Sequence, residues 1–186
     1  QDKIKKFPKT NPVHIYGATV SAVIIGNIYN IDPLRILILA EKESEFNANK
    51  SNKNKDGTRD IGIFQINSKN NPERTFLVDP SYELKRFNRT ITVLGGYLLD
   101  SFPRGLARPE ITQNTIGAAL TLVEKMRVTK NDWEKTYTAY NGNLSNPIAQ
   151  TYGKKAQEIY YQDTKKYIFE LRIDQPVRQL TSTNFR

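Results

Sequence analysis

The segment from Asp32 to Glu43 constrains the fold more than any other part of this sequence. Asp32 followed by Pro33 marks a helix start, because aspartate is a favoured N-cap and proline is favoured in the first turn. The residues that follow, PLRILILA, are apolar on nearly every side, as expected of a helix that runs through the middle of a core. The helix becomes polar only toward Glu41. We therefore expect its polar end to reach a cleft.

Helical spacing of apolar residues dominates the rest of the chain. The pattern predicts further helices over 15–29, 83–101, 109–127 and 132–140, and a last helix that begins at Pro147 after an Asn146 cap and continues past Tyr160. Residues 48–67 are instead rich in Asn, Lys, Ser, Asp and Gly, with Asp56-Gly57 as a turn signal. The sequence thus predicts a mainly α domain with a small loop or β-hairpin lobe.

The length of 186 residues suits one domain, which by the usual scaling buries roughly 70% of its unfolded surface. Residues 1–12 are polar, basic and interrupted by two prolines, so we expect a tether there and the domain over 13–167. Residues 168–186 alternate in character, and we expect a C-terminal tail packed on the domain. The chain has no cysteine, and no apolar run reaches the roughly 18 residues of a membrane span.

The net charge is +9, with 28 Lys and Arg against 19 Asp and Glu. Such a chain would suit a nucleic acid, an anionic membrane surface or an anionic polymer such as a wall glycan. The charge is spread along the sequence, and no stretch alternates arginines with aromatic residues as a stacking platform for nucleic acid would. Charge alone therefore predicts attraction to a polyanion without choosing among the three.

Two glutamates at the end of the apolar helix are candidates for acid catalysis. A carboxyl group among apolar side chains keeps its proton near neutral pH, as a general acid acting on a glycosidic oxygen requires. Glu43 lies on the same helical stripe as Ile36 and Leu39, and Glu41 lies on another stripe. Periodicity does not separate them.

Four short fragments follow one another along the chain. They are Glu43-Ser44-Glu45-Phe46, Gly62-Ile63-Phe64-Gln65-Ile66, Ala139-Tyr140-Asn141 and Tyr152-Gly153-Lys154-Lys155-Ala156. In order and spacing they resemble the lytic transglycosylases and goose-type lysozymes, which cut the peptidoglycan of bacterial walls. The resemblance implies a lysozyme-like fold with a groove between the small lobe and the helices. It also favours Glu43 over Glu41 as the acid, because the family keeps its acid before Ser-x-Phe.

The resemblance also implies roles for the other motif residues. Substrate binding is expected of Ser51, Asp60, Gly62, Phe64, Gln65, Tyr140, Asn141 and Tyr152, with Glu43 as the catalytic residue. Phe64 stands where the family usually has methionine. Asp56 and Asp60 are both candidates for a second carboxylate, but Asn67 occupies a position that is acidic in goose-type lysozymes, which weakens the hydrolase interpretation.

The leading hypothesis is a peptidoglycan lytic transglycosylase that forms a 1,6-anhydro product. A muramidase that hydrolyses the same bond and a non-catalytic wall-binding or assembly protein are the alternatives. His14 is the only histidine and cysteine is absent, so we expect no metal, and without a phosphate-binding loop we expect no cofactor. We expect a monomer that binds glycan strands rather than nucleic acid, in the periplasm, the cell envelope or outside the cell.

Overall fold

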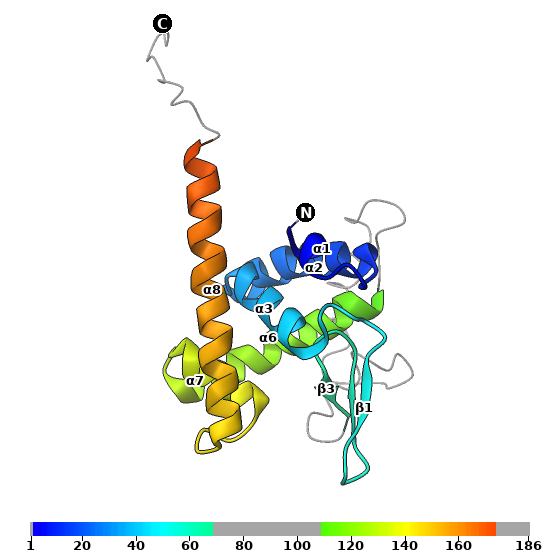
Figure 1. Cartoon of the computed structure of the whole chain (residues 1–186). Helices are drawn as coiled ribbons and strands as arrows, with labels where there is room; N and C mark the ends of the chain where they lie inside the picture. Colours follow the sequence, from blue (N-terminus) through cyan, green and yellow to red (C-terminus); the bar gives the residue numbers. More distant parts are fainter. Residues whose placement is uncertain (1, 69–108, 174–186) are drawn as a thin grey trace, which may run out of the picture.

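The computed structural model describes residues 2–68 and 109–173, and Figure 1 shows their arrangement. Six helices occur in these ranges: α1 (Asp2–Lys6), α2 (Pro12–Tyr29), α3 (Pro33–Ser44), α6 (Pro109–Thr129), α7 (Trp133–Asn141) and α8 (Pro147–Ile173). Three short strands, β1 (Ser51–Lys53), β2 (Arg59–Ile61) and β3 (Ile66–Asn67), form one antiparallel sheet in the order β1-β2-β3. The predicted fold class, a mainly α lysozyme-like domain with a small lobe, is confirmed.

Helices α3 and α8 begin where the sequence predicts, because polar side chains cap them, whereas α2 begins at Pro12, earlier than the predicted 15–29, after an Asn11 cap. The Asp32 carboxylate accepts a hydrogen bond from the Leu34 amide at 2.9 Å. Asn146 accepts one from the Ile148 amide, also at 2.9 Å. Each bond satisfies one of the backbone N–H groups that have no partner inside the first turn.

Helix α3 lies in the middle of the core and packs against α2, α6 and α8. Its side chains Ile36, Ile38 and Leu39 are fully buried. Arg35 is buried too, and its guanidinium carbon lies 3.2 Å from the ring centroid of Tyr160 in α8 and 4.7 Å from that of Trp133 in α7. Cation–π contacts of this kind attract a desolvated cation. They hold α3 between the two helices.

The small sheet projects from the helical body (Figure 1). Strands β1 and β2 pair from Ser51 opposite Ile61 to Lys53 opposite Arg59, and Gly57 forms the turn between them with a φ of +84°. The lobe was expected to be a loop or a hairpin. The addition of β3 to β2 makes it a three-stranded sheet.

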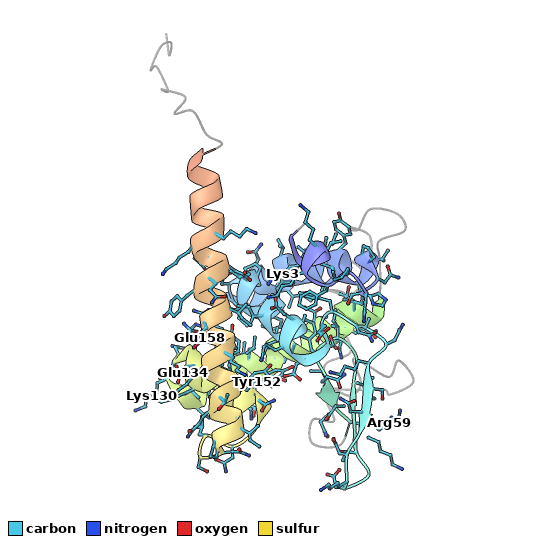
Figure 2. All side chains as sticks on the ribbon, in the orientation of Figure 1. Lys3, Arg59, Lys130, Glu134, Tyr152 and Glu158 are labelled. Carbon is cyan, nitrogen blue, oxygen red and sulfur yellow. The ribbon has the colours of Figure 1, made fainter. Side chains whose placement is uncertain are left out.

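The N-terminal segment, which we expected to be a tether, is folded against the domain. Lys3 and Lys6 of α1 both bind the carboxylate of Glu41 in α3, and Lys3 also binds Asp163 in α8 at 2.7 Å. Glu41 is only 6% exposed. A carboxylate withdrawn from water needs a cation beside it, and α1 supplies two. Figure 2 marks Lys3 at the junction of α1 with the rest of the domain.

The C-terminal helix is longer than the sequence predicted. Helix α8 continues to Ile173, so residues 168–173 of the expected tail are helical. Residues 174–186 and the helix predicted over 83–101 lie outside the described residues. Within the described ranges, no helix combines the length and the apolar character that crossing a membrane requires.

The pairing of Glu41 predicts a measurable stability effect. A K3M/K6M variant should lose about 3 kcal/mol of unfolding free energy in urea titrations, because it leaves a buried carboxylate without its cations. Adding Glu41→Gln should recover part of that loss, since a neutral amide needs no counter-ion. Equal stability with and without the Glu41 change would contradict this account of α1.

Candidate active site

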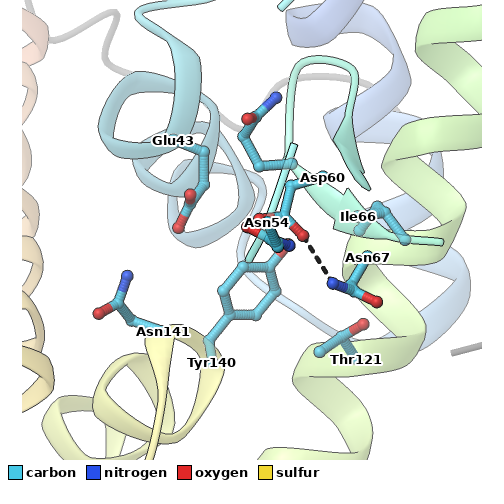
Figure 3. Close-up of a pocket in the computed structure, with 9 residues that line it drawn as sticks. Glu43, Asn54, Asp60, Ile66, Asn67, Thr121, Tyr140 and Asn141 are labelled. Atoms are coloured by element: carbon cyan, nitrogen blue, oxygen red, sulfur yellow. Dashed lines mark hydrogen bonds between the residues drawn. The ribbon is translucent and has the colours of Figure 1, made fainter. Parts of the chain in front are cut away.

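A cavity of about 330 Å³ lies between the end of α3, the small sheet and the helices α6 and α7. It is lined by Glu43, Asn54, Asp60, Gln65, Ile66, Asn67, Thr121, Tyr140 and Asn141. Figure 3 shows the Glu43 side chain entering from α3, with Tyr140 and Asn141 on the α7 side. Polar side chains predominate in the lining, which suits a ligand rich in hydroxyl and amide groups.

Glu43 is partly buried in the last turn of α3, and its Oε1 accepts a hydrogen bond of 2.6 Å from the hydroxyl of Tyr152. Burial raises the pKa of Glu43, and the negative charge of Asp60 adds to the rise. The Tyr152 hydrogen bond and the charges of Lys50 and Lys42 lower this pKa but do not cancel the effect of burial. The side chain therefore retains its proton to higher pH than an ordinary glutamate.

The structure separates the two candidate glutamates. Glu41 is bound by the lysines of α1 and does not line the cavity, whereas Glu43 points into it. Glu41 is a structural carboxylate, and Glu43 alone of the two can meet a ligand there.

Tyr152 reaches Glu43 because α7 and α8 approach each other closely. A Cβ added to the neighbouring Gly153 would lie 2.2 Å from Thr138 Oγ1 and 2.5 Å from the Glu134 carbonyl oxygen, so only glycine allows this contact. Burial, followed by the proximity of Glu43, raises the pKa of Tyr152, so its hydroxyl keeps its proton and remains a donor. Tyr152 lies on the side of α8 that faces the domain (Figure 2).

Gly62 and the residues after it are held by a buried asparagine. Gly62 has a φ of +81°, and a Cβ there would lie 2.7 Å from Asn114 Oδ1. Asn114 of α6 accepts a hydrogen bond from the Phe64 amide at 2.8 Å and donates one to the Ile61 carbonyl at 3.1 Å. Tyr140 donates to the Phe64 carbonyl at 3.0 Å. Phe64, which we expected to bind substrate, is thus fully buried and supports this segment.

Gln65 lines the cavity with its side-chain amide already engaged. Its Nε2 donates to the carbonyls of Gly62 at 2.7 Å and Lys50 at 3.1 Å, while its Oε1 accepts from Asn52 at 2.5 Å. These bonds allow the residue to keep a left-handed φ of +50°. Gln65 therefore stabilises the connection between the lobe and the site.

The two candidate second carboxylates occupy different places. Asp60 lines the cavity and accepts a hydrogen bond from Asn67 Nδ2 at 2.9 Å, drawn as a dashed line in Figure 3. Asp56 lies in the hairpin turn, does not line the cavity, and accepts from the amide and hydroxyl of Thr58 at 3.0 and 2.7 Å. Asp60 is therefore the carboxylate that shares the cavity with Glu43.

The other expected site residues divide by location. Tyr140 and Asn141 line the cavity, whereas Gly62 and Phe64 are buried outside its lining. Ser51 is exposed on β1, where it accepts from the Arg59 side chain, and it is not part of the lining.

Sequence reasoning missed Asn54, Thr121 and the buried Asn114. Asn114 had a signal, because it falls on the same helical stripe as Ile111 and Ala118, where a polar residue must find partners in the core. The described residues contain no cluster of three or more His, Cys, Asp or Glu side chains placed to bind a metal ion.

A comparison with protein-family models finds one match relevant to this site. The family described as the Transglycosylase SLT domain matches residues 23–162. The matched range includes Glu43, the sheet, α6, α7 and Tyr152, but not α1. Comparisons with curated proteins and with solved structures gave no match.

The raised pKa of Glu43 predicts a stability cost that depends on pH. The unfolded chain releases this proton at the ordinary carboxyl pKa, whereas the folded chain holds it to higher pH, so the folded state loses stability as pH rises between the two values. The Glu43→Gln variant should therefore have a larger free energy of unfolding than the wild type at pH 7. The difference should vanish below about pH 4, where both states are protonated.

Urea titrations across this pH range measure the effect of Glu43→Gln. Glu158→Gln, on the exposed side of α8, is the matched control and should show no such pH-dependent gain. A Glu43→Gln protein that is less stable than the wild type at pH 7 would contradict the raised pKa.

Proposed function

The chain belongs to the SLT transglycosylase family, and on that premise we propose that it cleaves the β-1,4 bond between N-acetylmuramic acid and N-acetylglucosamine in peptidoglycan. The observation that carries the proposal is the Glu43 carboxyl group, which enters a polar cavity with a pKa raised by burial and with a neutral hydroxyl bonded to it. An acid with these properties can protonate a glycosidic oxygen near neutral pH.

The proposed reaction uses Glu43 twice. Its proton passes to the glycosidic oxygen, the bond from that oxygen to C1 of the muramyl residue breaks, and an oxocarbenium-like centre develops at C1. The Glu43 carboxylate then takes the proton of the sugar's own 6-hydroxyl, whose oxygen bonds to C1. The product carries a 1,6-anhydro ring, no water is consumed, and Glu43 ends protonated as it began.

Tyr152 suits both halves of this cycle. Its hydroxyl donates to Glu43 Oε1 and favours the carboxylate that exists between the two proton transfers. Because Tyr152 itself stays protonated, it adds no competing charge to the site. One carboxyl group suffices for this cycle, because the nucleophile is the sugar's own 6-hydroxyl and no water has to be activated.

The lining offers amide and hydroxyl groups to the substrate. Asn141 is exposed at the cavity and Tyr140 beside it is half-buried, so both are placed to contact sugar hydroxyls or acetamido groups. The net charge of +9 favours an acidic wall polymer. A cell-envelope location and a monomeric state are part of the proposal.

Hydrolysis of the same bond is a second candidate, favoured by Asp60. A hydrolase of the usual type needs a second carboxyl group to act as nucleophile or to activate water. Asp60 lines the cavity with Glu43, and Asn67 orients it through the 2.9 Å hydrogen bond. The products distinguish this reaction from transglycosylation.

Digestion of purified peptidoglycan tests the proposal. The wild type should release anhydro-ended muropeptides, each lighter by one water than a lysozyme product in mass spectrometry. Glu43→Gln should lower the rate by at least about 10², the lower end of what a positioned acid contributes. If no fragments appear from a substrate that a muramidase digests, the protein is not this enzyme, and the wall-binding interpretation replaces it.

The role of Asp60 has its own test. If the reaction is transglycosylation, Asp60→Asn should still give only anhydro-ended products, because no water is activated. If water enters through Asp60, the wild type will give reducing-ended products and Asp60→Asn will lose them. Asp56→Asn is the matched control, since that carboxylate lies outside the cavity lining.

A further inference from the structure

Lys50 connects the end of α3 to the small lobe through both its side chain and its backbone. Its Nζ donates a hydrogen bond of 2.5 Å to the carbonyl oxygen of Glu43. Its own carbonyl accepts from the Gly62 amide at 2.9 Å and from Gln65 Nε2 at 3.1 Å. One residue thus contacts the candidate acid and two residues of the segment that forms the other side of the site.

We propose that Lys50 is a positioning residue for the reaction, holding the backbone of Glu43 and the Gly62–Gln65 segment in one fixed arrangement. The inference rests on the proposed function. Lys50 is not part of any of the four motif fragments, because it lies between the first fragment and the second.

The helix end explains why a lysine is effective here. Carbonyl groups in the last turn of a helix have no partner within it, and together they form the negative end of the helix dipole. The Lys50 ammonium group binds one of these carbonyls and stabilises the helix end electrostatically. Because the carbonyl belongs to Glu43, the bond restrains the residue whose side chain must meet the scissile oxygen.

The ammonium group also acts on the Glu43 carboxyl group. In the part of the chain that the structure describes, this carboxyl is affected by Tyr152 from α8, Asp60 from β2, Lys42 from α3 itself and Lys50. Burial and Asp60 raise the pKa of Glu43, and Tyr152 and the two lysines lower it. An acid that must also serve as a base needs groups that lower its pKa as well as groups that raise it, since a carboxyl that never ionises cannot take the second proton.

Lys42 provides a matched control, because it places a positive charge near the site without connecting α3 to the lobe. Its Nζ lies 5.1 Å from the ring centroid of Tyr152, so it is a second cation close to the site. Unlike Lys50, it lies within α3 and does not join the helix to the lobe. A purely electrostatic role would make the two lysines similar, whereas a positioning role makes Lys50 distinct.

The test compares K50M, K50R and K42M with the wild type. Without substrate, ¹³C NMR of glutamate side chains measures the Glu43 pKa, with Glu43→Gln identifying its resonance. K50M should raise this pKa, K42M should raise it less, and K50R should leave it near the wild-type value. With peptidoglycan, K50M should lower the maximal rate of anhydro-product release at least about tenfold even at its own optimal pH, because displaced groups react slowly.

K50R should restore most of that maximal rate, because it keeps both the charge and the hydrogen bond, and K42M should lose less of it than K50M does. A K50M protein with a wild-type maximal rate would overturn the inference whatever its Glu43 pKa, as would equal losses of rate in K50M and K42M. If K50M does not fold, K50Q replaces it, since glutamine retains a donor without the charge; a wild-type Glu43 pKa and rate in K50Q would likewise overturn the inference. If the wild type releases no fragments, the proposed function fails, and the NMR titration still decides the effect of Lys50 on Glu43.

Discussion

The cost of placing charged side chains inside the protein governs the organisation around α3. This helix carries Arg35, Glu41 and Glu43 away from full contact with water, and the three are compensated differently. Arg35 lies against aromatic rings and donates to the Gln157 side chain, and Glu41 binds two lysines. Among the described residues, the neutral hydroxyl of Tyr152 is the group that hydrogen-bonds the Glu43 carboxyl. The fully compensated charges hold the helix in place, and the incompletely compensated one is left reactive.

A second constraint is the turn that brings the lobe to the helices. The chain between β2 and β3 passes through left-handed conformations at Gly62 and Gln65, where regular strand pairing is interrupted. Asn114 in the core and Lys50 at the lobe satisfy the backbone groups of this turn. Since buried backbone groups without partners are costly, these side chains make the turn possible. The shape of the cavity therefore depends on residues that do not line it.

The helices show where local sequence signals suffice. Asp32 and Asn146 are predicted caps and observed caps, because a side chain that bonds an amide two residues away needs no tertiary contact. The N-terminal segment shows the opposite case. Polar, basic residues interrupted by prolines resemble a linker, yet Lys3 and Lys6 are ordered by a carboxylate in a distant helix. No local sequence pattern predicts such a contact.

Periodicity, capping residues and short motifs along the chain suffice to predict helices α2, α3, α6, α7 and α8, the Glu43 motif and the family. Which groups meet depends on the tertiary structure. Tyr152 reaches Glu43 across 109 residues, Asp60 rather than Asp56 shares its cavity, and Glu41 is withdrawn from it. The physical reason is that packing of α3 against α8, and of the lobe against α6, sets these distances. Contacts between distant segments follow from packing and not from local spacing.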